Sequence, residues 1–198
     1  SNMSDNQLVL DIPLIALAGN PNCGKTALFN ALTGGRQKVG NYPGVTVERK
    51  EGNAVTPSGK TVSLLDLPGT YSLDARTPDE VITRDVILGL QQSEASPMLL
   101  VAVADATNLE RNLGLVLELR ALNKPVVLAL NMMDLAEQRG LELDLVILAR
   151  ELGAPVVPTV AVRNKGMNEL LAQVEAQLQV TGVKPVNTPV WRKPSLEE

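Results

Sequence analysis

The sequence predicts an α/β protein with a doubly wound, mostly parallel sheet that helices cover on both faces. Short aliphatic runs alternate with longer stretches of helical periodicity along the 198 residues. The runs are continuously apolar, which is typical of strands buried on both faces of a parallel sheet. Aromatic residues make up only 2% of the chain, so aliphatic side chains must form the core.

Six segments are predicted to be strands. Five of them are the apolar runs at residues 12–18, 61–65, 98–104, 126–130 and 155–160. The sixth, at residues 47–56, is more polar, and a Pro-Ser-Gly-Lys turn joins it to the run that follows. Because the turn is tight, these two strands are expected to pair as an antiparallel hairpin. The predicted sheet therefore has six strands, with one antiparallel to the rest.

Helical periodicity fills the intervals between most of these strands. The clearest helix places apolar residues at i, i+3, i+4, i+7 and i+11 from Met167 to Leu178. Further helices are predicted at residues 145–152, 109–117 and 27–32, and from Pro78 onward. For the helix at 109–117, Asp105 or Thr107 is available as the N-cap.

Length and pattern divide the chain into three parts. Residues 1–11 are a lead-in, and its Ser-Asn before the first methionine resembles a tag-cleavage scar. Residues 12–179 hold the periodic pattern and are predicted to form one domain. Three prolines interrupt the pattern at residues 180–198, which predicts a linker or the start of a truncated helical domain.

The composition excludes several classes of protein. The chain has no histidine and a single cysteine, so it is no histidine-dependent hydrolase and holds neither a structural zinc site nor an internal disulfide. A net charge of -4 and a pI near 5.0 argue against a nucleic-acid partner. No apolar run reaches the roughly 18 to 20 residues that span a bilayer. These features predict a cytoplasmic domain.

A phosphate-binding loop is predicted between the first strand and the helix at 27–32. The sequence there fits G-x-x-x-x-G-K-[ST]. Glycines let backbone N–H groups converge on a phosphate, the lysine reaches the β- and γ-phosphates, and the threonine hydroxyl binds magnesium. The alternative is a glycine-rich turn without a ligand, but the flanking strand and helix favour phosphate. The predicted binding residues are Gly19, Asn20, Pro21, Asn22, Cys23, Gly24, Lys25, Thr26 and Ala27.

Two later segments can complete a phosphate and metal site. Asp66 follows the strand at 61–65 and can hold magnesium through water, while the Gly69 N–H can meet the γ-phosphate. Alone, this Asp-Leu-Pro-Gly sequence is more typical of an Asp-initiated turn. Thr46, with Gly44 and Val45, lies in a Gly/Pro-rich segment whose threonine hydroxyl can close over the metal. Thr46 could as easily be the first residue of a strand.

The sequence Asn131-Met132-Met133-Asp134 follows the strand at 126–130, at the sheet edge where ligands bind in α/β proteins. The Asp134 carboxylate can accept hydrogen bonds from N1–H and the exocyclic amine of guanine. Adenine has an acceptor at N1 and would leave the carboxylate unpaired, which discriminates by roughly 10⁴ or more. The alternative is a strand-ending Asn131 with Asp134 as a helix or turn cap.

The order of these motifs resembles that of the TRAFAC-type GTPases, within the P-loop NTPase fold. The segments at residues 19–34, 39–52, 66–73 and 131–134 are similar to those of the ferrous iron transport protein B family, over about residues 12–178. The resemblance implies a slowly hydrolysing GTPase with GTP or GDP and Mg²⁺ as ligands. It also implies helical and membrane domains in the same full-length chain, at the cytoplasmic face of the bacterial inner membrane.

The resemblance further implies that two loops relay the nucleotide state to the transporter and that this domain binds no iron. Loops 36–46 and 66–77 would report the nucleotide to the transporter, and the domain could form a homo-oligomer. No iron is expected here, because a histidine-free domain with one cysteine is poorly equipped to bind it.

Residue roles carry over where positions match. Asn22 would coordinate K⁺ beside the phosphates, together with backbone near Gly40 and Asn41, and would act with Lys25, Thr46 and Gly69 in catalysis. Thr70 replaces the usual water-positioning glutamine, which implies slow hydrolysis. Base-binding residues would be Asn131, Met132, Asp134, Ala161 and Val162.

Two other functions stay open at this point. A soluble ribosome- or tRNA-associated assembly GTPase is the alternative, although the charge disfavours RNA binding. A P-loop kinase or ATPase is the third interpretation, and it requires a preference for adenine.

Overall fold

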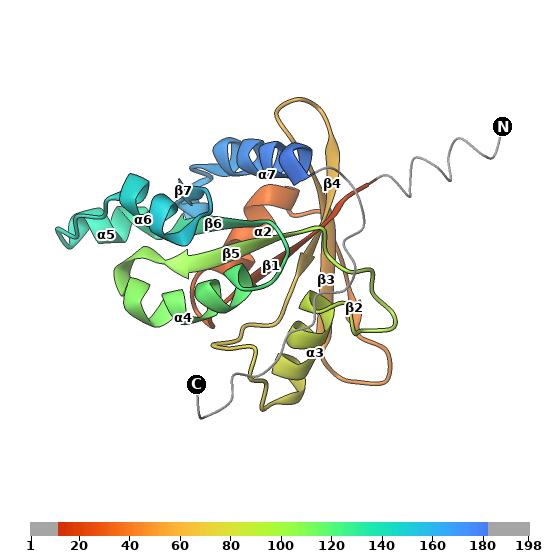
Figure 1. Ribbon diagram of the computed structural model, residues 1–198. Helices are drawn as coiled ribbons and strands as arrows, with labels where there is room; N and C mark the ends of the chain where they lie inside the picture. Colours follow the sequence, from red (N-terminus) through yellow and green to blue (C-terminus); the bar gives the residue numbers. More distant parts are fainter. Residues whose placement is uncertain (1–11, 182–198) are drawn as a thin grey trace.

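The computed structural model describes residues 12–181 (Figure 1). Within them, seven strands form one sheet in the order β2-β3-β4-β1-β5-β6-β7. The central strand β1 (Leu14–Gly19) runs parallel to its neighbours β4 (Thr61–Asp66) and β5 (Leu99–Asp105). The strands β6 (Val126–Asn131) and β7 (Val156–Pro158) extend the parallel part. The predicted mostly parallel α/β sheet is confirmed.

The predicted hairpin is present, but the predicted strand count is wrong by one. β3 (Glu48–Val55) pairs antiparallel with β4, as expected, and also with an additional edge strand, β2 (Gln37–Asn41). In β2 the one apolar side chain, Val39, is 60% exposed. Pairing with β3, rather than burial, therefore defines this strand, and hydrophobic periodicity gave no signal for it. Within the predicted loop at 36–46, residues 37–41 therefore form a strand.

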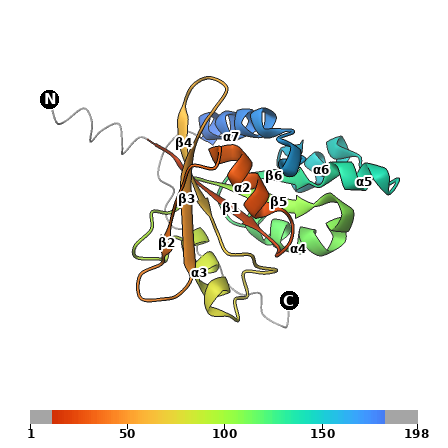
Figure 2. The ribbon, with the colours of Figure 1, turned by 180° about the vertical axis from the view of Figure 1, so that it is seen from behind.

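Helices cover both faces of the sheet, as predicted (Figures 1 and 2). On one face, α2 (Lys25–Thr33) and α7 (Met167–Thr181) pack against alternate strand residues. On the other lie α3 (Pro78–Ile87), α4 (Leu109–Arg120), α5 (Met133–Gln138) and α6 (Leu145–Leu152). The last helix, α7, extends two residues beyond the predicted domain limit at 179. The predicted segment at 1–11 and the rest of that at 180–198 lie outside the described residues.

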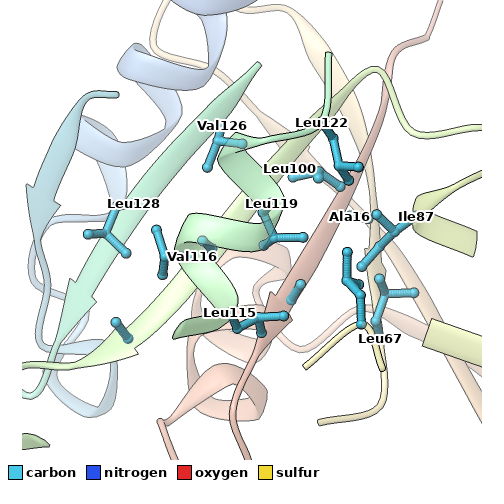
Figure 3. Close-up of a cluster of buried hydrophobic side chains, with 14 of the residues drawn as sticks. Ala16, Leu67, Ile87, Leu100, Leu115, Val116, Leu119, Leu122, Val126 and Leu128 are labelled. Atoms are coloured by element: carbon cyan, nitrogen blue, oxygen red, sulfur yellow. The ribbon is translucent and has the colours of Figure 1, made fainter. Parts of the chain in front are cut away.

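The alternation of β1 assigns its side chains to two cores. Ile15 and Leu17 face α2 and α7, whereas Ala16 and Ala18 join the cluster around α4. Figure 3 draws Ala16 in the same cluster as Leu115 and Leu119 of α4. Burial on both faces holds β1 rigidly, so the loop that leaves its carboxyl end starts from a fixed point.

Local chemistry sets the helix starts. α3 begins with a complete capping box, in which Thr77 and Glu80 exchange hydrogen bonds around Pro78. The predicted N-cap of the helix at 109–117, Asp105 or Thr107, is wrong, because Asn108 is the N-cap residue of α4. Asp105 instead caps the short 3-10 turn Ala106–Asn108 that precedes it. Among the described helices, none is long and apolar enough to cross a membrane.

Candidate functional site

Several of the predicted site residues lie at the carboxyl edge of the sheet. Gly19, Asp66, Asp105 and Asn131 each end a strand, and these four strands are neighbours in the order β4-β1-β5-β6. After β1 the chain builds one side of the sheet, and it then crosses to β5 to build the other. Such a reversal of strand order opens the crevice in which α/β proteins bind ligands.

The loop at residues 19–26 is packed so closely that its glycines are obligatory. A Cβ at Gly19 would lie 2.7 Å from both the Cys23 Sγ and the Val103 carbonyl oxygen. Gly24 has φ +84°, and a Cβ there would collide with the Asn131 side-chain amide. The compact turn leads into α2, where Gly24 is the N-cap and Lys25 the first helical residue. This backbone matches the predicted phosphate loop.

Cys23 is a buried part of this loop. Burial raises the pKa of its thiol, although Lys25 acts in the opposite direction. The thiol is therefore neutral near pH 7 and fills the space beneath Gly19. Its backbone carbonyl accepts a hydrogen bond from Asn131, described below.

Lys25 and Asp66 form a buried ion pair at the centre of the site. The Lys25 Nζ donates to the Asp66 Oδ1, and only 9% and 6% of the two residues are exposed. With Thr26 and Gly69 they line a hollow of about 230 Å³. Gly69 is confined, because a Cβ on it would lie 3.2 Å from the Pro21 backbone. Four residues predicted to meet phosphate or magnesium are thus brought together.

Thr46 is not among them. It is exposed, as are Gly44 and Val45, and the residues that line the hollow do not include it. The neighbouring Tyr42 and Val47 are buried in the core, and the Tyr42 N–H donates to the Val47 carbonyl over 3.0 Å. The turn between these two anchors therefore points its threonine to solvent. A role for Thr46 at the metal requires this loop to move and stays a prediction.

Asn131 joins three loops through one side chain. Its Nδ2 donates to the Cys23 carbonyl at 3.2 Å. Its Oδ1 accepts from the Thr159 hydroxyl at 3.0 Å and the Ala161 N–H at 3.1 Å. The alternative of a structural strand-ending asparagine is therefore correct in part, since Asn131 holds the phosphate loop against the loop after β7. Sequence reasoning missed Thr159, because nothing local marks a partner 28 residues away.

The other predicted base-binding residues flank Asn131. Met132 has a left-handed backbone with φ +61°, and it turns the chain sharply into α5. Asp134 is half-buried in the first turn of that helix. Ala161 is buried and tied to Asn131, whereas 81% of Val162 is exposed. Asn131 therefore fixes the loop that carries Asp134 relative to the phosphate loop.

Asn22 and the other predicted potassium ligands are not assembled. Asn22 is exposed with φ +66° and lines a separate hollow of about 140 Å³, together with Tyr71, Asp105 and Arg111. Gly40 and Asn41 lie on the edge strand β2, where they pair with β3. The structure thus places Asn22 at the surface of the phosphate loop and leaves the potassium site a prediction.

Comparison with known proteins agrees with this geometry. A family model described as ferrous iron transport protein B matches residues 13–174. The Fe(2+) transporter FeoB of Salmonella typhimurium is 48% identical over 165 residues, which cover 81% of this chain and 21% of that protein. The chain therefore spans about a fifth of the length of this curated relative.

Two solved structures with a similar fold are named as nucleotide-bound forms of a FeoB cytosolic domain. The cytosolic domain of the T. maritima FeoB iron transporter in its GMPPNP form is 46% identical, with a TM-score of 0.76. The match covers 83% of this chain and 63% of that one. The GDP form I of that domain is 43% identical with the same TM-score, over 90% of this chain and 66% of that one.

Proposed function

The chain belongs to the ferrous iron transport protein B family, and we propose that it is the GTP-binding and slowly GTP-hydrolysing G domain of a membrane transporter for ferrous iron. Because the chain covers 21% of its relative, transport would be an activity of the whole protein. Loops 36–46 and 66–77 would relay the nucleotide state to helical and membrane domains of the same chain. The domain would lie at the cytoplasmic face of the bacterial inner membrane and could form a homo-oligomer.

The observation that carries the proposal is the arrangement of Lys25, Thr26, Asp66 and Gly69 around one hollow beneath a tight glycine loop. A lysine and a hydroxyl at the start of a helix, with a carboxylate and a confined glycine after the neighbouring strand, are the groups that hold a nucleotide phosphate chain. The Asn131 hydrogen bonds tie the phosphate loop to the end of β6, three residues before Asp134, the proposed guanine-binding residue.

The chemistry would be displacement by water at the γ-phosphate, with this chain supplying position and charge. The Lys25 ammonium would leave Asp66 to contact the β- and γ-phosphates. The Gly69 N–H would hold a γ-phosphate oxygen. Thr26 and the freed Asp66 carboxylate are hard oxygen donors lining one hollow, which fits Mg²⁺. Magnesium, when bound there, would neutralise phosphate charge.

The assignment of guanine is tested by competition. We expect unlabelled GDP to displace a fluorescent GDP analogue from the domain, and ADP to require roughly 10⁴-fold higher concentration, because adenine cannot donate to Asp134. Phosphate release from GTP measures the hydrolysis in the same preparation. Tight binding of ADP without binding of GDP would contradict the proposal and support the kinase or ATPase interpretation. The alternative function, a ribosome- or tRNA-associated GTPase, is not favoured, because the chain belongs to the ferrous iron transport protein B family.

We also propose that K⁺ stimulates hydrolysis through Asn22. Its side chain lies on the surface of the phosphate loop, where a cation could stabilise charge that develops on the phosphates. GTP turnover in potassium chloride should exceed that in sodium chloride several-fold. Replacement of Asn22 by alanine should remove the difference between the two salts. Equal rates in the two salts with the unaltered protein would exclude this role.

A further inference from the structure

Helix α4 contacts two loops of the proposed nucleotide site. At its first turns, the Arg111 carbonyl accepts a hydrogen bond from the Asn20 side chain of the phosphate loop at 3.2 Å. The Arg111 guanidinium carbon also lies 4.6 Å from the centroid of the Tyr71 ring, close enough for a cation–π contact. One residue of α4 therefore lies against both the phosphate loop and the segment that follows Gly69.

Two turns further along α4, Glu118 binds the same segment with both carboxylate oxygens. Its Oε1 accepts from the Ser72 hydroxyl at 2.7 Å, and its Oε2 accepts from the Leu73 N–H at 2.6 Å. Charge-assisted hydrogen bonds of this kind are about twice as strong as neutral ones. Glu118 follows Arg111 by seven residues, which places both on one face of the helix.

The segment held by Glu118 leads directly back to Gly69. The Thr70 N–H donates to the Gly19 carbonyl at 3.0 Å, and the Thr70 hydroxyl donates to the Ser72 carbonyl at 2.7 Å. The segment at 70–73 is therefore fixed at one end to the phosphate loop and at the other to α4. Both end residues, Thr70 and Leu73, are buried, whereas Tyr71 between them is exposed.

We propose that Glu118 is a positioning residue, which holds the segment at 70–73 so that the Gly69 N–H meets the terminal phosphate of GTP. The inference rests on the proposed function. GDP lacks the phosphate that Gly69 would contact, so Glu118 contributes to recognition of GTP and to hydrolysis but not to binding of GDP. Through Glu118 and Arg111, α4 senses which nucleotide is bound.

The test compares four variants of the domain. Glu118→Ala removes both hydrogen bonds. Glu118→Gln retains them, because its carbonyl can accept from the Leu73 N–H while its amide donates to the Ser72 hydroxyl oxygen. Glu110→Ala, which removes an exposed carboxylate from the same helix, is the matched control. Ser72→Ala removes one of the two bonds from the loop side.

For Glu118→Ala we expect about tenfold weaker binding of GMPPNP and about tenfold slower hydrolysis, an effect in the usual range for coupling between sites. The affinity for GDP should stay unchanged, and exchange of the Leu73 amide hydrogen should accelerate. Glu118→Gln should restore most of the loss, Glu110→Ala should resemble the unaltered protein, and Ser72→Ala should show a smaller loss of the same kind.

Two results would overturn the inference. In one, GDP and GMPPNP affinities fall together, which indicates a purely structural role. In the other, a folded Glu118→Ala protein binds and hydrolyses as before. If Glu118→Ala does not fold, the same comparison on Ser72→Ala decides. Failure of the proposed function is recognised separately, because the unaltered protein would then not hydrolyse GTP.

Discussion

Replacing Lys25 with methionine is expected to reduce GTP hydrolysis by about 10²- to 10³-fold or more, the loss seen when one preorganised charge-stabilising group is removed. The same change should destabilise the fold by about 3–5 kcal/mol, because it leaves a buried carboxylate without its partner. The two effects have different causes: the phosphates lose a cation, and Asp66, 6% exposed, loses its ion pair.

A second substitution separates these effects. In the double variant Lys25→Met/Asp66→Leu, both charges are removed together, and two apolar side chains of similar shape occupy the space. Stability should return to within about 1 kcal/mol of the original, since buried ion pairs are often no better than well-packed apolar groups. Hydrolysis should not recover. Urea denaturation measures the first quantity and phosphate release the second.

Lys60→Ala provides the control, because this exposed lysine lies in the β3–β4 turn at the other end of β4. It should leave both hydrolysis and stability nearly unchanged. If Lys25→Met were as stable as the original protein, the buried ion pair would be contradicted. If it still hydrolysed GTP at the original rate, the proposed catalytic role of Lys25 would be wrong.

Sequence reasoning predicted the residues whose placement depends on local chemistry. The loop at 19–26 needs glycines because its backbone packs against its own side chains and against Asn131. These glycines lie within one short segment, so the sequence motif alone predicts the loop. Asp66 and Asn131 were found because parallel strands carry their carboxyl ends to one edge. The buried cores followed from continuous apolar runs, since burial on both faces excludes polar alternation.

The features that were missed depend on partners far away in the chain. β2 exists because β3 pairs with it, and its own residues carry no apolar pattern. Thr159 gains its role from Asn131, 28 positions earlier, and Glu118 from Ser72, 46 positions earlier. Thr46 faces solvent because Tyr42 and Val47 are the buried residues of its loop, a choice that composition does not reveal. Such contacts follow from the fold rather than from any single segment.

Asp134→Asn should change which base the domain binds. The aspartate would accept from both N1–H and the exocyclic amine of guanine. The asparagine side chain has one acceptor, its carbonyl oxygen, and one donor group, its NH₂. The NH₂ would face the exocyclic amine of guanine, which is also a donor, so no hydrogen bond could form there. Affinity for GDP should fall on the order of 10³- to 10⁴-fold, as expected when a buried polar group is left unpaired. Xanthosine diphosphate, which carries an oxygen in place of that amine, should bind the variant instead.

The exchange of specificity distinguishes base recognition from the other interpretation of Asp134. A carboxylate in the first turn of α5 also interacts favourably with the helix dipole, and its removal would cost about 0.3–1 kcal/mol of stability whatever the nucleotide. Glu137→Gln removes an exposed carboxylate from the same helix and should leave GDP binding unchanged. Loss of both diphosphates in Asp134→Asn would indicate a structural role, and unchanged GDP binding would exclude contact with the base. Asn131 ties the loop that carries Asp134 to the phosphate loop. Binding of xanthosine diphosphate by Asp134→Asn would therefore show that residue 134 contacts the base, at a position fixed relative to the phosphate site.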